Sequence, residues 1–283
     1  MLGVRFFLGT ILFLVLSQMV ASAQSLASAE FPFQFREGFI WVQVSAARAE
    51  KPMNFLVDTG AGVSVIDQSV ARRLGLKRGQ PVRVSGVQAT TTGFWPQRVA
   101  AKVGEVSLPR NLLAIDLAAF SRACATPVDG LLGADFFHGK VVQIDFRERM
   151  IRLLTAAQRR QLRGETVALD IRSCGMRVPV SVNGGEPQWL RLDTGCAAPL
   201  HWVANSVDPK NCRHQLAVGL AELSLPTTTV AAKLGAEKFD QVAAVIHDRE
   251  IFAGEAGLLG TGLLSRFAQV TVDSAAKRLV LAQ

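Results

Sequence analysis

Two stretches decide the fold of this chain, NFLVDTG at 54–60 and WLRLDTG at 189–195. In each, Asp-Thr-Gly directly follows a short apolar run of the kind that forms a strand. Each is followed further along the chain by the same tetrapeptide, GLLG, at 130–133 and at 257–260. A given tripeptide occurs by chance at roughly 2 in 10,000 positions at average residue usage, so two copies in matched settings indicate a duplication.

The duplication extends beyond these motifs. VAAKVG at 99–104 returns as VAAKLG at 230–235, and VQIDF at 142–146 is paralleled by VTVDS at 270–274. The spacing between matched segments drifts by only a few residues, which short loop insertions explain. Because only two long units repeat, we predict two fused, similar lobes rather than a solenoid.

The two motifs supply one aspartate to each half, Asp58 and Asp193. Hydrolysis of an amide needs a base acting on water and an acid acting on the carbonyl oxygen. Two carboxyl groups held together in a dry site cannot both ionise cheaply, so they share one proton and contain an acid and a base at once. Gly60 and Gly195 allow sharp turns in which backbone N–H groups reach the carboxylates.

The stretch FLVDTGAGVSVI at 55–66 resembles the retropepsin-like branch of the aspartic peptidases, and two such lobes in one chain resemble the pepsin layout. The resemblance covers roughly residues 31–283. It implies a mainly β, bilobal acid-protease fold, with two similar small β-barrel-like lobes, short helices and a cleft between the lobes. It also implies that Asp58 and Asp193 are catalytic and activate one water, with no cofactor and no metal.

The same resemblance gives roles to the residues around the aspartates. The two threonine hydroxyls are expected to cross-link the turns of the two lobes. Each GLLG is expected to pass beneath a turn, where its glycines permit close backbone approach. The supporting residues of the active-site turns are Thr59, Gly60, Ala61, Thr194 and Gly195.

The second motif departs from the family pattern after its glycine. Cys196 takes the place of Ala61, and counting from the aspartates puts Pro199 at the position of Ser64. Proline has neither a hydroxyl nor an N–H, so the departure concerns the geometry of the second turn more than its charge. It leaves open a second function, a bilobal peptide-binding or envelope-associated protein without turnover.

A flap is expected over the cleft, because excluding water strengthens the electrostatics of the site. We predict it between Val84 and Val99, with Gly86 and Gly93 as turn residues. Pepsin-like enzymes carry a tyrosine on this hairpin, but this chain has none, and Trp95 is the candidate to replace it. Packing of Trp95 against its own sheet is the alternative.

The N-terminus has the pattern of a secretory signal. Arg5 precedes an apolar run that continues to Val20, and ASA at 21–23 offers small residues for cleavage. The run is short for a membrane span, which favours cleavage over retention as an anchor. We therefore predict a periplasmic or secreted protein with a signal peptide at 1–23, an N-terminal lobe at 24–155, a linker at 156–166 and a C-terminal lobe at 167–283.

Charge and cysteine content narrow the partners. The net charge is +8, or +7 without Arg5, but the basic residues are scattered along the chain. A mildly basic, solvated surface is therefore favoured over nucleic-acid binding. In an oxidising compartment four cysteines allow up to two disulfides. The sequence does not fix their connectivity, and the pairing that we predict is Cys196–Cys212 and Cys124–Cys174.

Other polar residues are predicted to be structural. Asp129 has no acidic counterpart in the second repeat and indicates a turn, whereas Asp145 and Asp273 recur late in terminal strands and indicate strand ends. The histidines are dispersed and lack ligand spacing, which argues against a metal site or a catalytic triad. The histidines are His138, His201, His214 and His247.

Three local signals predict secondary structure. A short helix is predicted from about Gln68 to Leu74, with Asp67 as its N-cap and Gly75 at its end. Asn183-Gly184 predicts a hairpin before the second catalytic strand. The segment 155–163, closed by a glycine, indicates a charged helix or linker between the lobes.

These observations favour an exported aspartic endopeptidase that cleaves extended peptides or unfolded proteins between its lobes. No serine stands in a nucleophile elbow, and GTG at 260–262 lacks the third glycine of a dinucleotide turn. With both lobes in one chain, we expect a monomer that binds no nucleic acid and has no membrane span after cleavage. Physiological substrate, subsite preference and pH optimum stay open.

Overall fold

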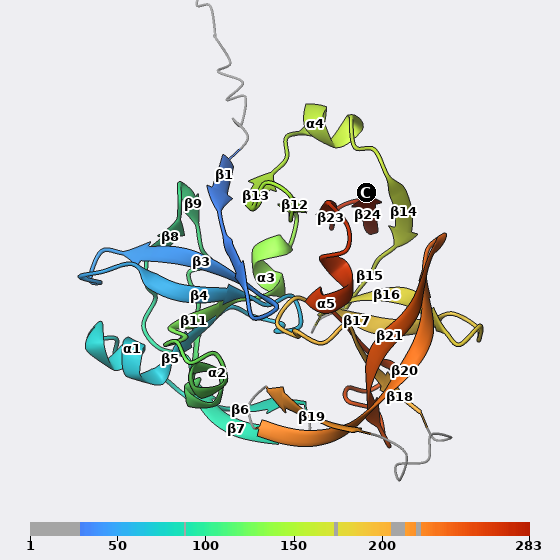
Figure 1. Cartoon of the computed structure of the whole chain (residues 1–283). Coiled ribbons are helices and arrows are strands. Elements are labelled where there is room, and N and C mark those ends of the chain that lie inside the picture. The colour runs from blue at the N-terminus through green and yellow to red at the C-terminus, as the bar shows by residue number, and fades with distance from the viewer. Residues whose placement is uncertain (1–28, 88, 173–174, 205–212, 219–221) are drawn as a thin grey trace, which may run out of the picture.

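The computed structural model describes residues 29–283 except 88, 173–174, 205–212 and 219–221. The predicted signal peptide at 1–23 lies outside the described residues. Within them, no helix has the length and apolar character needed to cross a membrane. The fold is mainly β, as predicted, and consists of three sheets with short helices at their margins (Figure 1).

The first sheet is built by the N-terminal half. At its centre, β4 (Met53–Val57) lies between β3 (Phe39–Ala46) and β11 (Gly130–Leu132) and leads directly into Asp58. β4 and β11 are parallel, so GLLG lies alongside the strand that enters the first turn. The remaining strands are β2 (Gln34–Arg36), β5 (Val65–Asp67), β6 (Pro81–Gly86), β7 (Ala89–Phe94), β8 (Ala101–Val103), β9 (Val106–Ser107) and β10 (Leu113–Ile115).

The second sheet repeats this arrangement in the C-terminal half. β17 (Gln188–Asp193) lies between β16 (Gly175–Val182) and a parallel β22 (Gly257–Gly260). The duplication can be followed residue by residue. Leu56 of β4 pairs with Trp41 of β3, and at the same positions in the second lobe Arg191 pairs with Arg177. The remaining strands are β15 (Asp170–Arg172), β18 (Leu200–Val203), β19 (Arg213–Val218), β20 (Glu222–Leu234) and β21 (Glu237–His247).

The third sheet is shared by both halves and joins them. Its central pair is β12 of the first half against β23 of the second, in antiparallel register. The strands lie in the order β1 (Ala29–Pro32), β13 (Met150–Leu153), β12 (Val141–Asp145), β23 (Gln269–Asp273), β24 (Arg278–Ala282) and β14 (Glu165–Ala168). The predicted linker at 156–166 contains α4 (Ala156–Arg160) and enters β14 (Figure 1).

The local signals in the sequence have the predicted outcomes. α1 (Gln68–Arg73) begins after Asp67, whose carboxylate accepts the N–H groups of Ser69 and Val70, and it ends before Gly75 at φ +66°. Asn183-Gly184 forms the tight turn between β16 and β17, with positive φ at both residues. The other helices are α2 (Ala118–Ala123), α3 (Ala134–Phe137) and α5 (Thr261–Leu264).

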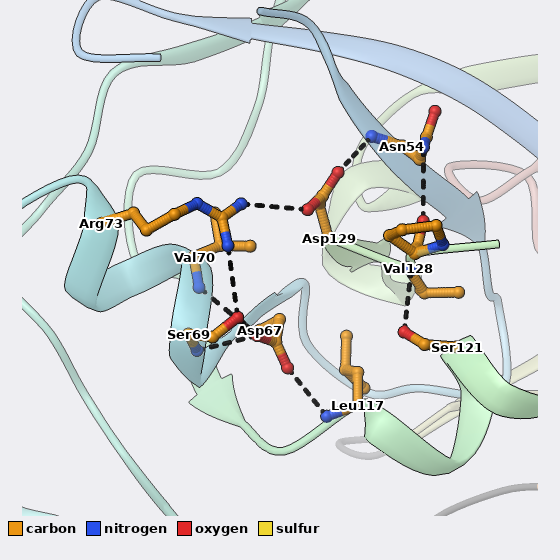
Figure 2. Close-up of polar contacts among 10 residues, drawn as sticks. Asn54, Asp67, Ser69, Val70, Arg73, Leu117, Ser121, Val128 and Asp129 are labelled. Atoms are coloured by element: carbon orange, nitrogen blue, oxygen red, sulfur yellow. Dashed lines mark hydrogen bonds and ion pairs between the residues drawn. The ribbon is translucent and has the colours of Figure 1, made fainter. Parts of the chain in front are cut away.

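Asp129, predicted to be a turn residue, connects three segments of the first lobe (Figure 2). Its carboxylate accepts the N–H of Asn54 at 2.8 Å, at the start of β4, and pairs with Arg73 of α1 at 3.4 Å. Beside it, the carboxylate of Asp67 accepts the N–H of Leu117 at 3.0 Å. These bonds fix the start of β4, which leads to the first turn, and the end of β5, which follows it.

Asp145 and Asp273 lie at the ends of β12 and β23, as predicted. Both are buried and paired with arginine, Asp145 with Arg152 at 2.9 Å and Asp273 with Arg159 at 2.7 Å. Arg159 belongs to α4, so this pair ties the connection between the halves to the shared sheet.

Each lobe carries a hairpin where a flap is expected, but the predicted boundaries are wrong. In the first lobe the hairpin consists of β6 and β7 and spans 81–94 rather than 84–99. Gly93 is not a turn residue, since it lies within β7, where a Cβ would meet the carbonyl oxygen of Ala114. Trp95 lies at the base of the hairpin and donates its backbone N–H to Gln80.

β19 and β20 form the matching hairpin of the second lobe. Figure 1 shows β19 and β20 on the same side of the molecule as β6 and β7. The layout thus has one such hairpin per lobe.

The predicted disulfides are not formed. Cys124 and Cys196, one partner of each predicted pair, are free thiols. Cys174 and Cys212 lie outside the described residues. Burial raises the pKa of the Cys124 thiol to about 11 and raises the pKa of Cys196 well above its ordinary value.

Two of the four histidines, although dispersed in the sequence, meet in the fold. His201 of β18 and His247 of β21 are buried side by side, with Nδ1 of the first 2.9 Å from Nε2 of the second. The strands that carry them are parallel neighbours, although 46 positions separate the residues in the chain. Among the described residues, no three His, Cys, Asp or Glu side chains group to hold a metal ion.

Candidate active site

The two Asp-Thr-Gly turns lie between the first and second sheets. Asp58 directly follows β4, and its N–H donates to the carbonyl of Leu132 in β11 at 2.9 Å. Asp193 ends β17 and pairs with Gly260 of β22. In both lobes a buried apolar strand delivers the aspartate, and the parallel GLLG strand holds it from the side.

The turns converge on one another. A Cβ atom on Gly60 would overlap the carboxyl group of Asp193, and one on Gly195 would overlap the carboxyl group of Asp58. The two carboxyl groups are close enough to alter each other's pKa, and only 7% of Asp58 and 9% of Asp193 is exposed. Glycine is therefore required after each Thr by the opposite aspartate, a constraint that a single lobe does not contain.

Thr59 and Thr194 cross-link the turns through four hydrogen bonds. Thr59 Oγ1 donates to the carbonyl of Leu192 at 2.7 Å and accepts the N–H of Thr194 at 3.0 Å. Thr194 Oγ1 donates to the carbonyl of Val57 at 2.8 Å and accepts the N–H of Thr59 at 3.0 Å. Both threonines are buried, so each hydroxyl satisfies two backbone groups of the opposite lobe.

Backbone N–H groups bind each carboxylate within its own turn. Asp58 Oδ1 accepts the N–H of Ala61 at 3.0 Å, and Asp193 Oδ1 accepts the N–H of Gly195 at 2.9 Å. All five supporting residues predicted from the sequence thus lie at the turns. Their amides favour the charged carboxylate, which opposes the effect of burial.

Burial dominates the acidity of the aspartate pair. It raises the pKa of Asp58 above the ordinary value, although the N–H of Ala61 and the charge of Arg191 lower it. Burial raises the pKa of Asp193 well above the usual range, and the negative charge of Asp58 raises it further. Two like charges in one dry site explain why the pair binds a proton that a solvent-exposed aspartate would release.

The predicted match of Pro199 with Ser64 is wrong by one residue. Ser64 directly precedes Val65, which pairs with Leu131 of the first GLLG. Leu200 holds the equivalent place in the second lobe, where it pairs with Leu259 of the second GLLG. The second turn is therefore one residue longer than the first.

The extra residue also replaces the lost hydroxyl. In the first lobe Ser64 Oγ accepts the N–H of Gly133 at 3.0 Å. In the second lobe the carbonyl of Pro199 accepts the N–H of Gly260 at 3.1 Å. A backbone oxygen thus takes over the acceptor role, and the second turn keeps its geometry.

Arg191, two residues before the second aspartate, was not predicted as part of the site. It is 4% exposed, and its guanidinium binds both carboxylate oxygens of Glu255 at 2.7 Å. Its third nitrogen donates to the carbonyl of Gly60, in the opposite turn, at 2.9 Å. The available signal was the repeat itself, because Leu56 occupies the same position in the first lobe.

Comparison with known proteins agrees with this geometry. Residues 42–136 match the family described as aspartyl protease. The fold is similar to that in the crystal structure of aspartic proteinase from Irpex lacteus, with a TM-score of 0.57 and 13% identity, over 91% of this chain and 97% of that chain. None of the curated proteins matches the sequence. The N-terminal half of the chain thus matches the aspartyl protease family, and the whole chain has the bilobal fold of an aspartic proteinase.

Proposed function

We propose that the protein is an aspartic endopeptidase in which Asp58 and Asp193 activate one water for attack on a peptide bond. The observation that carries the proposal is the convergence of the two carboxyl groups, each of which lies where a Cβ atom on the opposite turn's glycine would stand. The ionised member takes a proton from water while the protonated member donates to the carbonyl oxygen of the substrate. The raised pKa values of the pair support one retained proton.

The substrate that we propose is an extended peptide or an unfolded protein. Hairpins from both lobes lie on one side of the molecule and resemble flaps that lie over a peptide (Figure 1). The two turns come from different lobes and their carboxyl groups meet, which fits a substrate that lies across the junction.

The proposed location is outside the cytoplasm, because residues 1–23 have the pattern of a cleaved signal. One chain supplies both aspartates, so we also propose a monomer. Expression of the full sequence with its N-terminus intact tests the first proposal. Mass spectrometry of the exported protein should find a chain that begins at Gln24, and retention of Met1 on the membrane would contradict cleavage.

A cleavage assay tests the catalytic proposal. Protein beginning at Gln24 is incubated with unfolded protein substrates from acidic to neutral pH, beside Asp58→Asn, Asp193→Asn and the control Asp240→Asn, whose side chain is exposed in β21. Both active-site variants should lose at least about a hundredfold in rate, since each removes a proton-transfer group. The control should cleave as wild type does.

The outcomes separate the candidate functions. Undiminished cleavage by either active-site variant would refute the proposed pair. Peptide binding without cleavage by any form would instead indicate a non-catalytic peptide-binding protein.

A further inference from the structure

The layer of side chains beneath the catalytic turns is apolar in one lobe and charged in the other. In the first lobe, Trp41, Leu56 and Val128 belong to a buried apolar cluster on the face of the sheet opposite the main core. Strand pairing identifies the counterparts of Trp41 and Leu56 in the second lobe. The counterpart of Val128 follows from the backbone bond of the next residue, since Asp129 donates to Asn54 as Ala256 donates to Trp189. These counterparts are Arg177, Arg191 and Glu255, which are 2%, 4% and 6% exposed.

The exchange extends along the same layer. Val65 pairs with Leu131 as His201 pairs with Leu258, so a buried histidine replaces a buried valine. Ile115 is replaced by His247 in the same way. Ile115 lies on β10, the parallel neighbour of β5, and His247 lies at the same register on β21, the parallel neighbour of β18. The second lobe therefore buries titratable side chains where the first lobe packs hydrocarbon.

Stability alone does not account for the ion pair of Arg191 and Glu255. Desolvation of two buried charges offsets most of their attraction, and apolar side chains of similar volume usually serve as well or better. The first lobe shows that this fold accepts Leu56 and Val128 at the two positions. Leu56 and Val128 have no hydrogen-bond donor, whereas Arg191 donates across to the carbonyl of Gly60 in the other lobe. This bond is what the charged pair adds, and its role needs an explanation of its own.

That bond reaches the peptide group that holds the first aspartate. Gly60 contributes the carbonyl and Ala61 the N–H of a single peptide unit. The carbonyl accepts from Arg191 at 2.9 Å, and the N–H donates to Asp58 at 3.0 Å. Rotation of this peptide would break both bonds. Glu255 on one side and the ring of Phe252, 3.9 Å from the guanidinium, fix the arginine itself.

We propose that Arg191, held by Glu255, is a positioning residue of the active site: from the second lobe it fixes the peptide that orients Asp58, and its charge favours the ionised form of the aspartate pair. The role rests on the proposed function, since it serves a pair that must keep one carboxylate charged. It also makes the two halves of a duplicated site unequal, because Leu56 can offer neither a donor nor a charge to the second turn.

Other groups near the aspartates do not supply this charge. Cys196 faces Asp193, but burial raises the pKa of its thiol well above the ordinary value and keeps it neutral. Glu255 lies behind Arg191 and partly cancels it. The positive charge of Arg191 lowers the pKa of both aspartates against the effect of burial. Its loss should therefore raise the pH at which the pair binds its second proton.

The test replaces the ion pair of Arg191 and Glu255 by the residues at the same positions in the first lobe. In Arg191→Leu with Glu255→Val, kcat should fall by up to about a hundredfold with little change in KM, because the aspartate is misplaced rather than the substrate. The acid limb of kcat/KM should move up by about one pH unit. Glu255→Gln keeps the packing but uncovers the charge of Arg191, so its acid limb should move down.

Arg177→Leu is the matched control. Arg177 is equally buried on the neighbouring strand, but it bonds to Asp170 and to the carbonyl of Gly254 rather than to a catalytic turn. This variant should be less stable without a shift of the acid limb. The proposal would be overturned if the acid limb of kcat/KM moved in the same direction in the double variant and in Glu255→Gln, or if it moved in neither variant.

A second readout does not depend on turnover. Carboxyl ¹³C signals of aspartate-labelled protein report the protonation of the pair in the same variants. The midpoints should move in the same opposite directions as the acid limbs. If wild type cleaves no substrate but these shifts occur, the proposed function fails, and only the effect of Arg191 on the protonation of the pair stands. If cleavage occurs and the signals do not shift, the proposed function stands and the role of Arg191 is refuted.

Discussion

Cys196 shows how a departure from the expected motif is absorbed at the scale of one residue. It stands at the position of Ala61, with its thiol 3.7 Å from the carbonyl of Ala198. Its neighbours leave little room, since a Cβ on Gly260 would lie 3.1 Å from its sulfur. Burial holds its pKa well above the ordinary value, and the charge of Asp193 adds to this, so the thiol carries no thiolate at neutral pH.

We predict that Cys196→Ala, which installs the first-lobe residue, cleaves substrate at the wild-type rate. In wild type, thiol-specific alkylation should be slow at Cys196 and at Cys124, because the thiolate is the reactive form. Mass spectrometry after brief labelling of the folded protein identifies the modified sites. Rapid labelling of Cys196, or loss of cleavage in the alanine variant, would assign the thiol a direct role.

At this scale the sequence predicted the aspartates of the candidate site but not Arg191. The catalytic candidates are evident, because Asp58 and Asp193 stand in short motifs whose glycines leave few alternatives. Arg191 was missed because an arginine within an alternating strand usually points to solvent. Its buried partners, Glu255 and the carbonyl of Gly60 in the opposite turn, are both distant in sequence.

At the scale of secondary-structure elements, the two turns depend on each other through the threonines. Replacing Thr194 by valine keeps the volume of the side chain but leaves the N–H of Thr59 and the carbonyl of Val57 without partners. We expect a loss of about 2–4 kcal/mol in the free energy of unfolding, since both groups stay buried.

Urea unfolding measures this loss. Thr166→Val in β14, where the side chain is exposed, is the matched control and should change stability by less than about 0.5 kcal/mol. An equal, small effect in both variants would mean that water replaces the lost partner.

β18 and β21 bring together a histidine pair whose effect on stability depends on pH. Burial lowers the pKa of His201 to about 3, with a further contribution from His247, and burial also lowers the pKa of His247. Below about pH 6.5 the unfolded chain therefore binds protons that the folded chain refuses. The stability contributed by the neutral pair is present above that pH and is lost as the pH falls toward 3.

We predict that His201→Val with His247→Ile, the first-lobe residues, flattens this dependence. Between pH 7 and pH 4.5, the free energy of unfolding of the double variant should rise by about 2–3 kcal/mol relative to that of wild type. This figure counts the contribution of His201 alone. Denaturant unfolding at the two pH values gives the difference directly. An unchanged difference between the proteins at both pH values would show that the histidines titrate alike in the folded and unfolded chains.

The hairpins show why some elements were misplaced from the sequence. Glycine usually marks a turn, but Gly93 is needed inside β7 because the carbonyl of Ala114 lies where a side chain would begin. The α1 helix and the Asn183-Gly184 turn were predicted correctly because their signals are local. Close approach between strands leaves no comparable signal.

At the scale of the whole molecule, the shared sheet makes the lobes interdependent. β12 and β23 pair over five residues, and the threonine bonds cross at the opposite end of the interface. We predict one cooperative unfolding transition. Single-tryptophan variants that keep Trp41 in the first lobe or Trp202 in the second should report the same urea midpoint. Separate midpoints would show that the lobes unfold independently.

The bilobal organisation was predictable because the chain repeats its own motifs, and the repeat carries the long-range information that one copy lacks. The chemical inequality of the lobes was not, since it depends on which repeat positions face the turns. A charged layer and an apolar layer occupy the same strands. Both are compatible with the duplicated backbone.

The central claim is that Asp58 and Asp193 act as one proton-sharing pair. The carboxyl titration of Asp58, followed by ¹³C NMR in wild type and in Asp193→Asn, tests it most directly. In wild type we predict two steps separated by more than about one pH unit, and in the variant a single step for Asp58. A single step with the same midpoint in both proteins would contradict the claim.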